Sequence, residues 1–262
     1  MILGALIGDF IGSLYEFRGI KGRNLPILTP KNKVTDESLL IYATDLALNS
    51  NKDYVSQYLY VIQEYPDVGY GQRLLDWSHS QDEFYTDSYG NGSSTRAIPI
   101  ANYSKSLDEA LMEAEKSAIC THDEPYAILC TKAVVETLFR LKQGENADAV
   151  KECISSKYFP LDIVLEDKTK DEEGFQECSS AIATVPVAIQ IGLNSRSFID
   201  AVRTCLYMGG DVDSIMCIAC SIASMRHPVL LDTEDETVKK ALSNHIHINY
   251  PEMYLFYKKL FV

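Results

Sequence analysis

Apolar residues recur at helical spacing through most of this chain, and no stretch alternates apolar and polar residues over the length of a β-strand. The segment 107–118 is typical, because Leu107, Ala110, Leu111, Ala114 and Ala118 would share one face of a helix. No internal repeat or long linker divides the chain. The sequence therefore predicts an all-α fold of roughly ten or more helices, in a single domain over residues 1–262.

The first predicted helix, residues 2–16, carries an unusual stripe of small residues. Gly4, Gly8, Gly12 and Glu16 follow one another at four-residue steps and so lie on one face. Each glycine costs a helix interior about 1 kcal/mol relative to alanine. Three of them on one face suggest close approach of another backbone or of a ligand. A plain helix-packing face, with Glu16 solvated, explains the spacing equally well.

Two short segments place hydroxyls and carboxylates together at the start of a predicted helix. The first is Thr35-Asp36-Glu37, and the second is Asp211-Val212-Asp213-Ser214, which follows Gly209 and Gly210. Helix capping alone would account for the first segment. The second precedes an almost entirely apolar run, where such a density of oxygen ligands is typical of a hard divalent cation.

Face to face, these two segments would offer four carboxylates and two hydroxyls. That set is sufficient for two cations sharing a bridging carboxylate. Oxygen ligands favour Mg²⁺ or Mn²⁺ over zinc, which prefers nitrogen and sulfur. Sequence spacing does not establish that the two segments meet.

A third segment, 87–96, contains the turn Gly90-Asn91-Gly92-Ser93. Small, turn-forming residues expose backbone N–H groups, which can hold a phosphate or a sugar. An ordinary turn is the alternative interpretation.

The charge balance and the cysteines limit the classes of partner and compartment. Lys and Arg number 24 against 37 Asp and Glu, a net charge of −13 that disfavours non-specific binding to nucleic acid or to anionic membranes. The seven cysteines are an odd number spread through apolar segments, as is typical of reduced thiols. Cys217 and Cys220 are expected to pack in the core. Residues 1–17 resemble neither a signal peptide nor a membrane span, so a cytoplasmic protein is expected.

The chain resembles the ADP-ribosylglycohydrolase family, of the dinitrogenase-reductase-activating glycohydrolase type. The resemblance covers about residues 2–226 and consists of ordered blocks rather than one short motif. These blocks are Gly4-Ala5-Leu6-Ile7-Gly8-Asp9 with Tyr15-Glu16-Phe17, Thr35-Asp36-Glu37-Ser38, Tyr65-Pro66 through Gly71, Ser88-Tyr89-Gly90-Asn91-Gly92-Ser93, Thr121-His122, Thr184-Val185-Pro186, and Gly209-Gly210-Asp211-Val212-Asp213-Ser214.

This resemblance implies an all-α hydrolase that cleaves the N- or O-glycosidic bond between ADP-ribose and an acceptor. The expected partners are ADP-ribose or a protein or small molecule that carries it, and the expected cofactors are two Mg²⁺ or Mn²⁺ ions. By position, the resemblance implies that Thr35, Asp36 and Glu37 bind one ion and Asp211 and Ser214 the other, with Asp213 between both. It implies that Gly90, Asn91, Gly92, Ser93 and His122 contact the ligand. For the transfer of a proton to the leaving group, the candidates are Glu16, Asp36 and Glu37.

The chain departs from the family pattern at three places near this site. Glu37 stands where the family usually has aspartate, Ser214 replaces a usual threonine, and Ser94-Thr95 replaces a usual Ala-Met. The first two changes keep a carboxylate and a hydroxyl. They also leave an alternative open, namely a weak or inactive family member that acts as an ADP-ribose-binding or structural protein.

Overall fold

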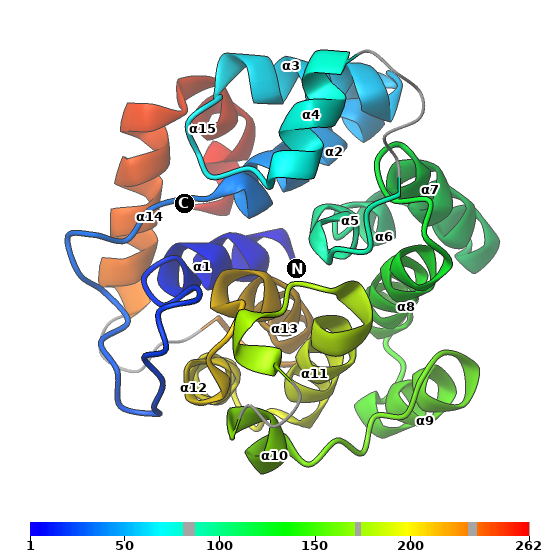
Figure 1. Cartoon of the computed structure of the whole chain (residues 1–262), viewed down its shortest axis with the longest axis vertical. Helices are drawn as coiled ribbons and strands as arrows, with labels where there is room; N and C mark the ends of the chain where they lie inside the picture. The colour runs from blue at the N-terminus through cyan, green and yellow to red at the C-terminus, as the bar shows by residue number, and fades with distance from the viewer. Residues whose placement is uncertain (81–86, 171–173, 230–234, 262) are drawn as a thin grey trace.

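The computed structural model describes residues 1–80, 87–170, 174–229 and 235–261 (Figure 1). The first half contains α1 (Ile2–Gly12), α2 (Asp36–Ser50), α3 (Tyr54–Glu64), α4 (Gln72–Ser80), α5 (Gly92–Arg96), α6 (Ile100–Tyr103) and α7 (Leu107–Ile119). The second half contains α8 (Pro125–Lys142), α9 (Ala147–Lys157), α10 (Leu165–Thr169), η1 (Phe175–Glu177), α11 (Ala181–Asn194), α12 (Phe198–Met208), α13 (Val212–Arg226), α14 (Asp235–Asn249), α15 (Pro251–Tyr257) and η3 (Lys258–Leu260).

These elements confirm the predicted all-α fold. Within the described ranges there is no β-strand, only two isolated bridges. One hydrophobic core draws on residues from Ala5 in α1 to Tyr257 in α15, so helices from both ends of the sequence share it. Among the described helices, none combines the length and apolar character needed to cross a bilayer.

Helices α1 and α13 lie side by side at the centre of the molecule (Figure 1). Helix α13 also packs against α11 and α12, and its residues from Val212 to Ala223 are buried. The thiols of Cys217 and Cys220 are free and fully buried within it, and burial raises the pKa of both. The expectation that these two cysteines pack in the core is confirmed.

The glycine stripe of α1 allows this central contact. A Cβ atom added at Gly8 would lie 2.5 Å from the carbonyl oxygen of Met216, and one at Gly4 would lie 2.5 Å from that of Cys220. Real Cβ atoms do not approach other atoms so closely, so glycine is required for the two backbones to touch. The stripe is therefore a helix-packing face on which two backbones touch, as both interpretations of it allow.

The predicted helix over residues 2–16 was too long, because α1 ends at Gly12. Residues 13–17 form turns instead, and Phe17 adopts a left-handed φ of 48°. The N–H of Phe17 donates to the carbonyl oxygen of Gly210 at 3.0 Å, which ties these turns to the connection between α12 and α13. Glu16 is therefore carried by a turn, where its side chain is exposed.

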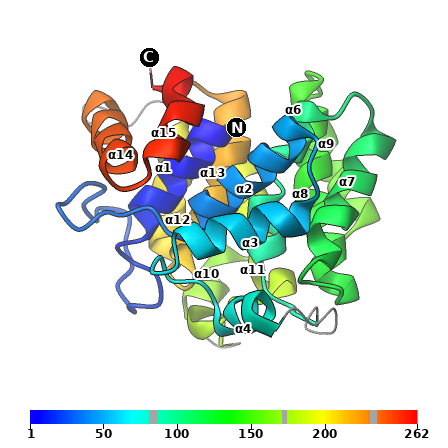
Figure 2. The ribbon, with the colours of Figure 1, turned by 90° about the horizontal axis from the view of Figure 1, so that it is seen from above.

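The remaining helices surround this centre. In two perpendicular views, α14 and α15 lie on one side of α1 and α13, and α7, α8 and α9 lie on the other (Figures 1 and 2). Helix α5 is a short element that packs against α2, α8 and α13. It therefore stands between the start of α2, the start of α13 and the long helix α8.

Candidate metal and substrate site

The two acidic helix starts predicted from the sequence are in direct contact. The hydroxyl of Ser214, in the first turn of α13, donates to Oε1 of Glu37, in the first turn of α2, at 2.6 Å. These residues are 177 positions apart in the chain. The tertiary structure thus brings together two segments whose meeting the sequence left open.

At the first helix start, capping is part of the explanation. Thr35 is the N-cap of α2, and its hydroxyl accepts a hydrogen bond from the N–H of Glu37 at 3.3 Å. Asp36 and Glu37, in contrast, line a cavity. The capping interpretation therefore describes Thr35, whereas Asp36 and Glu37 also belong to the wall of the cavity.

The start of α2 is held in place by Asp9, a residue for which the sequence alone predicts no role. It is fully buried in α1 and accepts hydrogen bonds from the N–H of Thr35 at 3.0 Å, the hydroxyl of Thr35 at 2.6 Å, and both the N–H and the hydroxyl of Ser38. Burial raises its pKa, while these hydrogen bonds lower it. The available signal was a single carboxylate inside an otherwise apolar helix.

At the second helix start, Asp211 and Asp213 converge with Glu16. One carboxylate oxygen from each lies within 4.8 Å of the other two. Gly209 and Gly210 precede them with left-handed φ values of 71° and 75°, which favour glycine and make the sharp turn into α13. This turn, together with the one that carries Glu16, aims three carboxylates at one point.

This group of carboxylates fits a hard divalent cation. All the donors are oxygen atoms, as Mg²⁺ and Mn²⁺ prefer. Burial raises the pKa values of Asp36 and Asp213 well above the usual value of an aspartate, and the negative charges of neighbouring carboxylates raise them further. Burial likewise raises the pKa of Glu37, to about 7. Carboxylates crowded in this way are costly when ionised, and a bound cation would relieve that cost.

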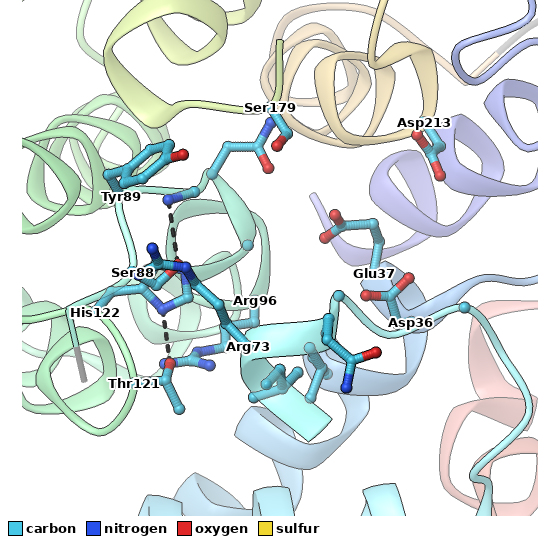
Figure 3. A pocket seen from close by; sticks show the side chains of 18 of the residues that line it. Asp36, Glu37, Arg73, Ser88, Tyr89, Arg96, Thr121, His122, Ser179 and Asp213 are labelled. Atoms are coloured by element: carbon cyan, nitrogen blue, oxygen red, sulfur yellow. Dashed lines mark hydrogen bonds between the residues drawn. The ribbon is translucent and has the colours of Figure 1, made fainter. Parts of the chain in front are cut away.

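Glu16, Asp36, Glu37 and Asp213 line one end of a cavity of about 390 Å³, within the usual size range of small-molecule sites. Figure 3 shows Asp36, Glu37 and Asp213 at one side of it. Ser88, Tyr89, Arg73 and His122 lie across the cavity from them. The cavity thus has an acidic end and an end rich in nitrogen donors and aromatic surface.

The loop at 90–93 lies between these two ends. Gly90, Asn91 and Gly92 line the cavity, and the amide of Asn91 donates to Oδ2 of Asp211 at 2.8 Å and to the hydroxyl of Thr184 at 3.0 Å. Ser93 differs from the other three residues. Its side chain is fully buried, and its hydroxyl accepts from Thr131 of α8 at 2.9 Å.

His122 is held as a neutral imidazole. Burial is the main cause that keeps its pKa well below the usual value, and the positive charge of Arg96 adds to it. Nδ1 lies 2.7 Å from the hydroxyl of Thr121, and Nε2 is directed toward Gly90, where an added Cβ would lie 3.6 Å away. A neutral ring can donate or accept a hydrogen bond at the cavity wall.

Arg96 anchors α5, at the end of that short helix. The guanidinium is fully buried, donates to the carbonyl oxygen of Ser117 at 2.6 Å, and lies 4.2 Å from the ring centroid of Tyr58. Arg96 thereby ties α5 to the C-terminal end of α7.

Comparison with known proteins agrees with this architecture. A solved structure described as "ADP-ribosylglycohydrolase-related protein complex" matches with a TM-score of 0.71 at 21% identity, covering 97% of this chain and 94% of that chain. At that identity the likeness supports the fold alone. No curated protein sequence matches the chain. The profile of the ADP-ribosylglycohydrolase family matches residues 1–229. The chain therefore belongs to the ADP-ribosylglycohydrolase family.

Proposed function

We propose that this protein hydrolyses the glycosidic bond between ADP-ribose and an acceptor, and so reverses ADP-ribosylation, with the help of two Mg²⁺ or Mn²⁺ ions. Membership of the family supports the hydrolysis of ADP-ribose linkages. The observation that carries the dependence on metal is the convergence of Glu16, Asp36, Glu37 and Asp213 on one cavity. A site made only of closely spaced oxygen donors suits Mg²⁺ or Mn²⁺.

The proposed ligands divide into two groups. Glu16, Asp211 and Asp213 would hold one ion, in keeping with the proximity of their carboxylate oxygens. Thr35, Asp36 and Glu37 would hold the other, with Asp213 between the two ions and Ser214 beside it. When bound, such ions would make a water molecule nucleophilic at neutral pH and would neutralise the charge of the carboxylates.

ADP-ribose would lie along the cavity, with the ribose diol at the acidic end. Gly90, Asn91 and Gly92 would contact the sugar and the diphosphate, and the neutral His122 would bind at the opposite end. These roles are supported by the residues that line the cavity and by its size. Ser93 would contact ADP-ribose through its backbone, since its side chain faces Thr131.

In the reaction, a new bond forms between the oxygen of water and the anomeric carbon as the bond to the acceptor breaks. Positive charge develops on the sugar, and the nearby carboxylates would stabilise it. The departing acceptor takes a proton, for which Glu16, Asp36 and Glu37 are the candidates. The proton that the attacking water loses would return to the same carboxylate, so that the protons of the reaction balance.

The decisive experiment measures release of ADP-ribose from ADP-ribosylated protein with Mg²⁺, with Mn²⁺ and with a chelator. Asp213→Asn should lower the rate by on the order of a hundredfold or more, because it would remove the carboxylate that we propose both ions share. Asp148→Asn, in the first turn of α9, is the matched control and should behave as the wild type. Unchanged release by Asp213→Asn would reject the two-metal proposal.

The same assay distinguishes the alternative function and narrows the acceptor. A protein that binds ADP-ribose without releasing it from any linkage would be the binding member of the family considered above. Substrates that carry ADP-ribose on arginine, on serine, on a nucleic-acid end and on a small metabolite should be compared. The net charge of −13 favours a basic acceptor such as arginine.

A further inference from the structure

Glu37 has both of its carboxylate oxygens engaged by hydroxyls from two other helices. Ser214 of α13 donates to Oε1 at 2.6 Å, and Thr95 of α5 donates to Oε2. Glu37 lines the cavity, whereas Thr95 is fully buried and can reach a ligand only through Glu37. Three helices therefore meet at this one carboxylate.

The position of the Thr95 hydroxyl is itself well determined. It lies 3.0 Å from the carbonyl oxygen of Gly92, and the N–H of Thr95 donates to the carbonyl oxygen of Asn91 at 3.2 Å. The next residue, Arg96, ties α5 to α7. The hydroxyl is thus presented to Glu37 from a short helix held at both of its ends.

A glutamate needs such support more than an aspartate does. Its side chain has one more rotatable bond, so fixing its carboxylate costs more conformational entropy. Hydrogen bonds to an ionised carboxylate are stronger than those between neutral groups, and two of them can fix its orientation. Glu37, Thr95 and Ser214 are the three residues that touch here.

We propose that Thr95 is a positioning residue that orients Glu37 for cation binding, and that Glu37, Thr95 and Ser214 act as one unit. The inference rests on the proposed function, in which the acidic end of the cavity binds divalent cations. Groups that orient metal ligands typically contribute a factor of about 10 to 100 in affinity. A hydroxyl that never touches the ion should therefore control how tightly the ion binds.

The test is calorimetric titration of the metal-free protein with Mn²⁺ alone. Thr95→Val, which removes the hydroxyl and keeps the shape, should weaken the Glu37-dependent binding by about tenfold. Thr95→Ser retains the hydroxyl and should stay within about twofold of the wild type. Thr137→Val is the matched control, because Thr137 is also fully buried but donates to Ala133 inside α8. It should leave the affinity unchanged.

A double-mutant cycle then shows whether Thr95 acts through Glu37. In a Glu37→Gln background, Thr95→Val should add no further loss, because the carboxylate that it orients is gone. The carboxylates of Glu16, Asp211 and Asp213 remain, so residual binding can still be measured. Thermal melting verifies that each variant is folded, and Thr95→Ala replaces Thr95→Val should valine prevent folding.

The possible failures are distinct. A wild-type protein that binds no Mn²⁺ would reject the metal-dependent function itself. Wild-type binding that Thr95→Val leaves intact would reject only the role of Thr95. An equal loss from Thr95→Val in the wild-type and Glu37→Gln backgrounds would also reject it, since Thr95 would then act by another route.

Discussion

Gly12 at the end of α1 lies directly against Asp213 in the first turn of α13. A Cβ atom at position 12 would come within 2.4 Å of the Cα atom of Asp213. The contact between the two central helices therefore ends on a proposed metal ligand. It gives the glycine stripe a role in the site as well as in packing.

The first prediction follows from this contact. Gly12→Ala should push the start of α13 away from α1, lower the free energy of unfolding by about 1–3 kcal/mol, and weaken Mn²⁺ binding. Gly4→Ala is the comparison, because its Cβ would meet Cys220 at the far end of the same interface. Gly4→Ala should lower the free energy of unfolding by a similar amount and leave the Mn²⁺ affinity nearly unchanged. Urea unfolding and calorimetry measure the two effects, and equal loss of metal binding by both variants would contradict the prediction.

The second prediction concerns Asp9, which accepts hydrogen bonds from the N–H groups of Thr35 and Ser38. Asp9→Asn replaces one acceptor oxygen by an amide that can only donate, and so leaves buried donors unpaired. The free energy of unfolding should fall by about 1–3 kcal/mol. Because the start of α2 loses its support, Mn²⁺ affinity should fall by on the order of tenfold or more.

A surface aspartate provides the control for Asp9. Asp53 is the N-cap of α3 and accepts from the N–H of Ser56 at 2.8 Å. Asp53→Asn keeps a good capping residue and should change neither the stability nor the metal affinity measurably. Metal binding that survives in Asp9→Asn would show that Asp9 supports only the fold.

The third prediction concerns pH and stability. Asp45 of α2 is buried and accepts a hydrogen bond from the hydroxyl of Tyr257 at 2.8 Å, and burial raises its pKa above the usual value. The folded state therefore favours the neutral acid. The stability it contributes is complete below the pKa of the unfolded chain, about 4, and is lost as the pH rises through the higher pKa of the folded state.

Asp45→Asn lacks this charge and should therefore be more stable than the wild type near neutral pH. The advantage should shrink as the pH falls toward about 4, where the wild-type carboxyl is also neutral. Urea unfolding at several pH values measures the difference. A variant less stable than the wild type at neutral pH would contradict the sign of this effect.

The fourth prediction separates the two ends of the cavity. His122 lies across the cavity from Asp36, Glu37 and Asp213 (Figure 3). His122→Ala should weaken binding of ADP-ribose by about tenfold, the worth of a lost hydrogen bond, and leave Mn²⁺ affinity unchanged. His79→Ala, on the exposed face of α4, should alter neither. ADP-ribose binding that is unaffected by His122→Ala would remove His122 from the proposed site.

Local patterns in the sequence were sufficient to predict the fold class and the two acidic helix starts. Helical spacing of apolar residues, the cap at Thr35 and the glycines before Asp211 all act within one or two turns of chain. Those features depend on the geometry of a single helix and its ends. They therefore do not depend on how the helices pack against one another.

The contacts between helices could not be predicted in this way. Three contacts depend on which helix surfaces pack together. They join Ser214 to Glu37, Asp9 to Thr35, and Ser93 to Thr131. Many arrangements of the same helices satisfy the same local patterns. Here the arrangement is set by burial of one shared core, and by glycines that allow α1 and α13 to approach until their backbones touch.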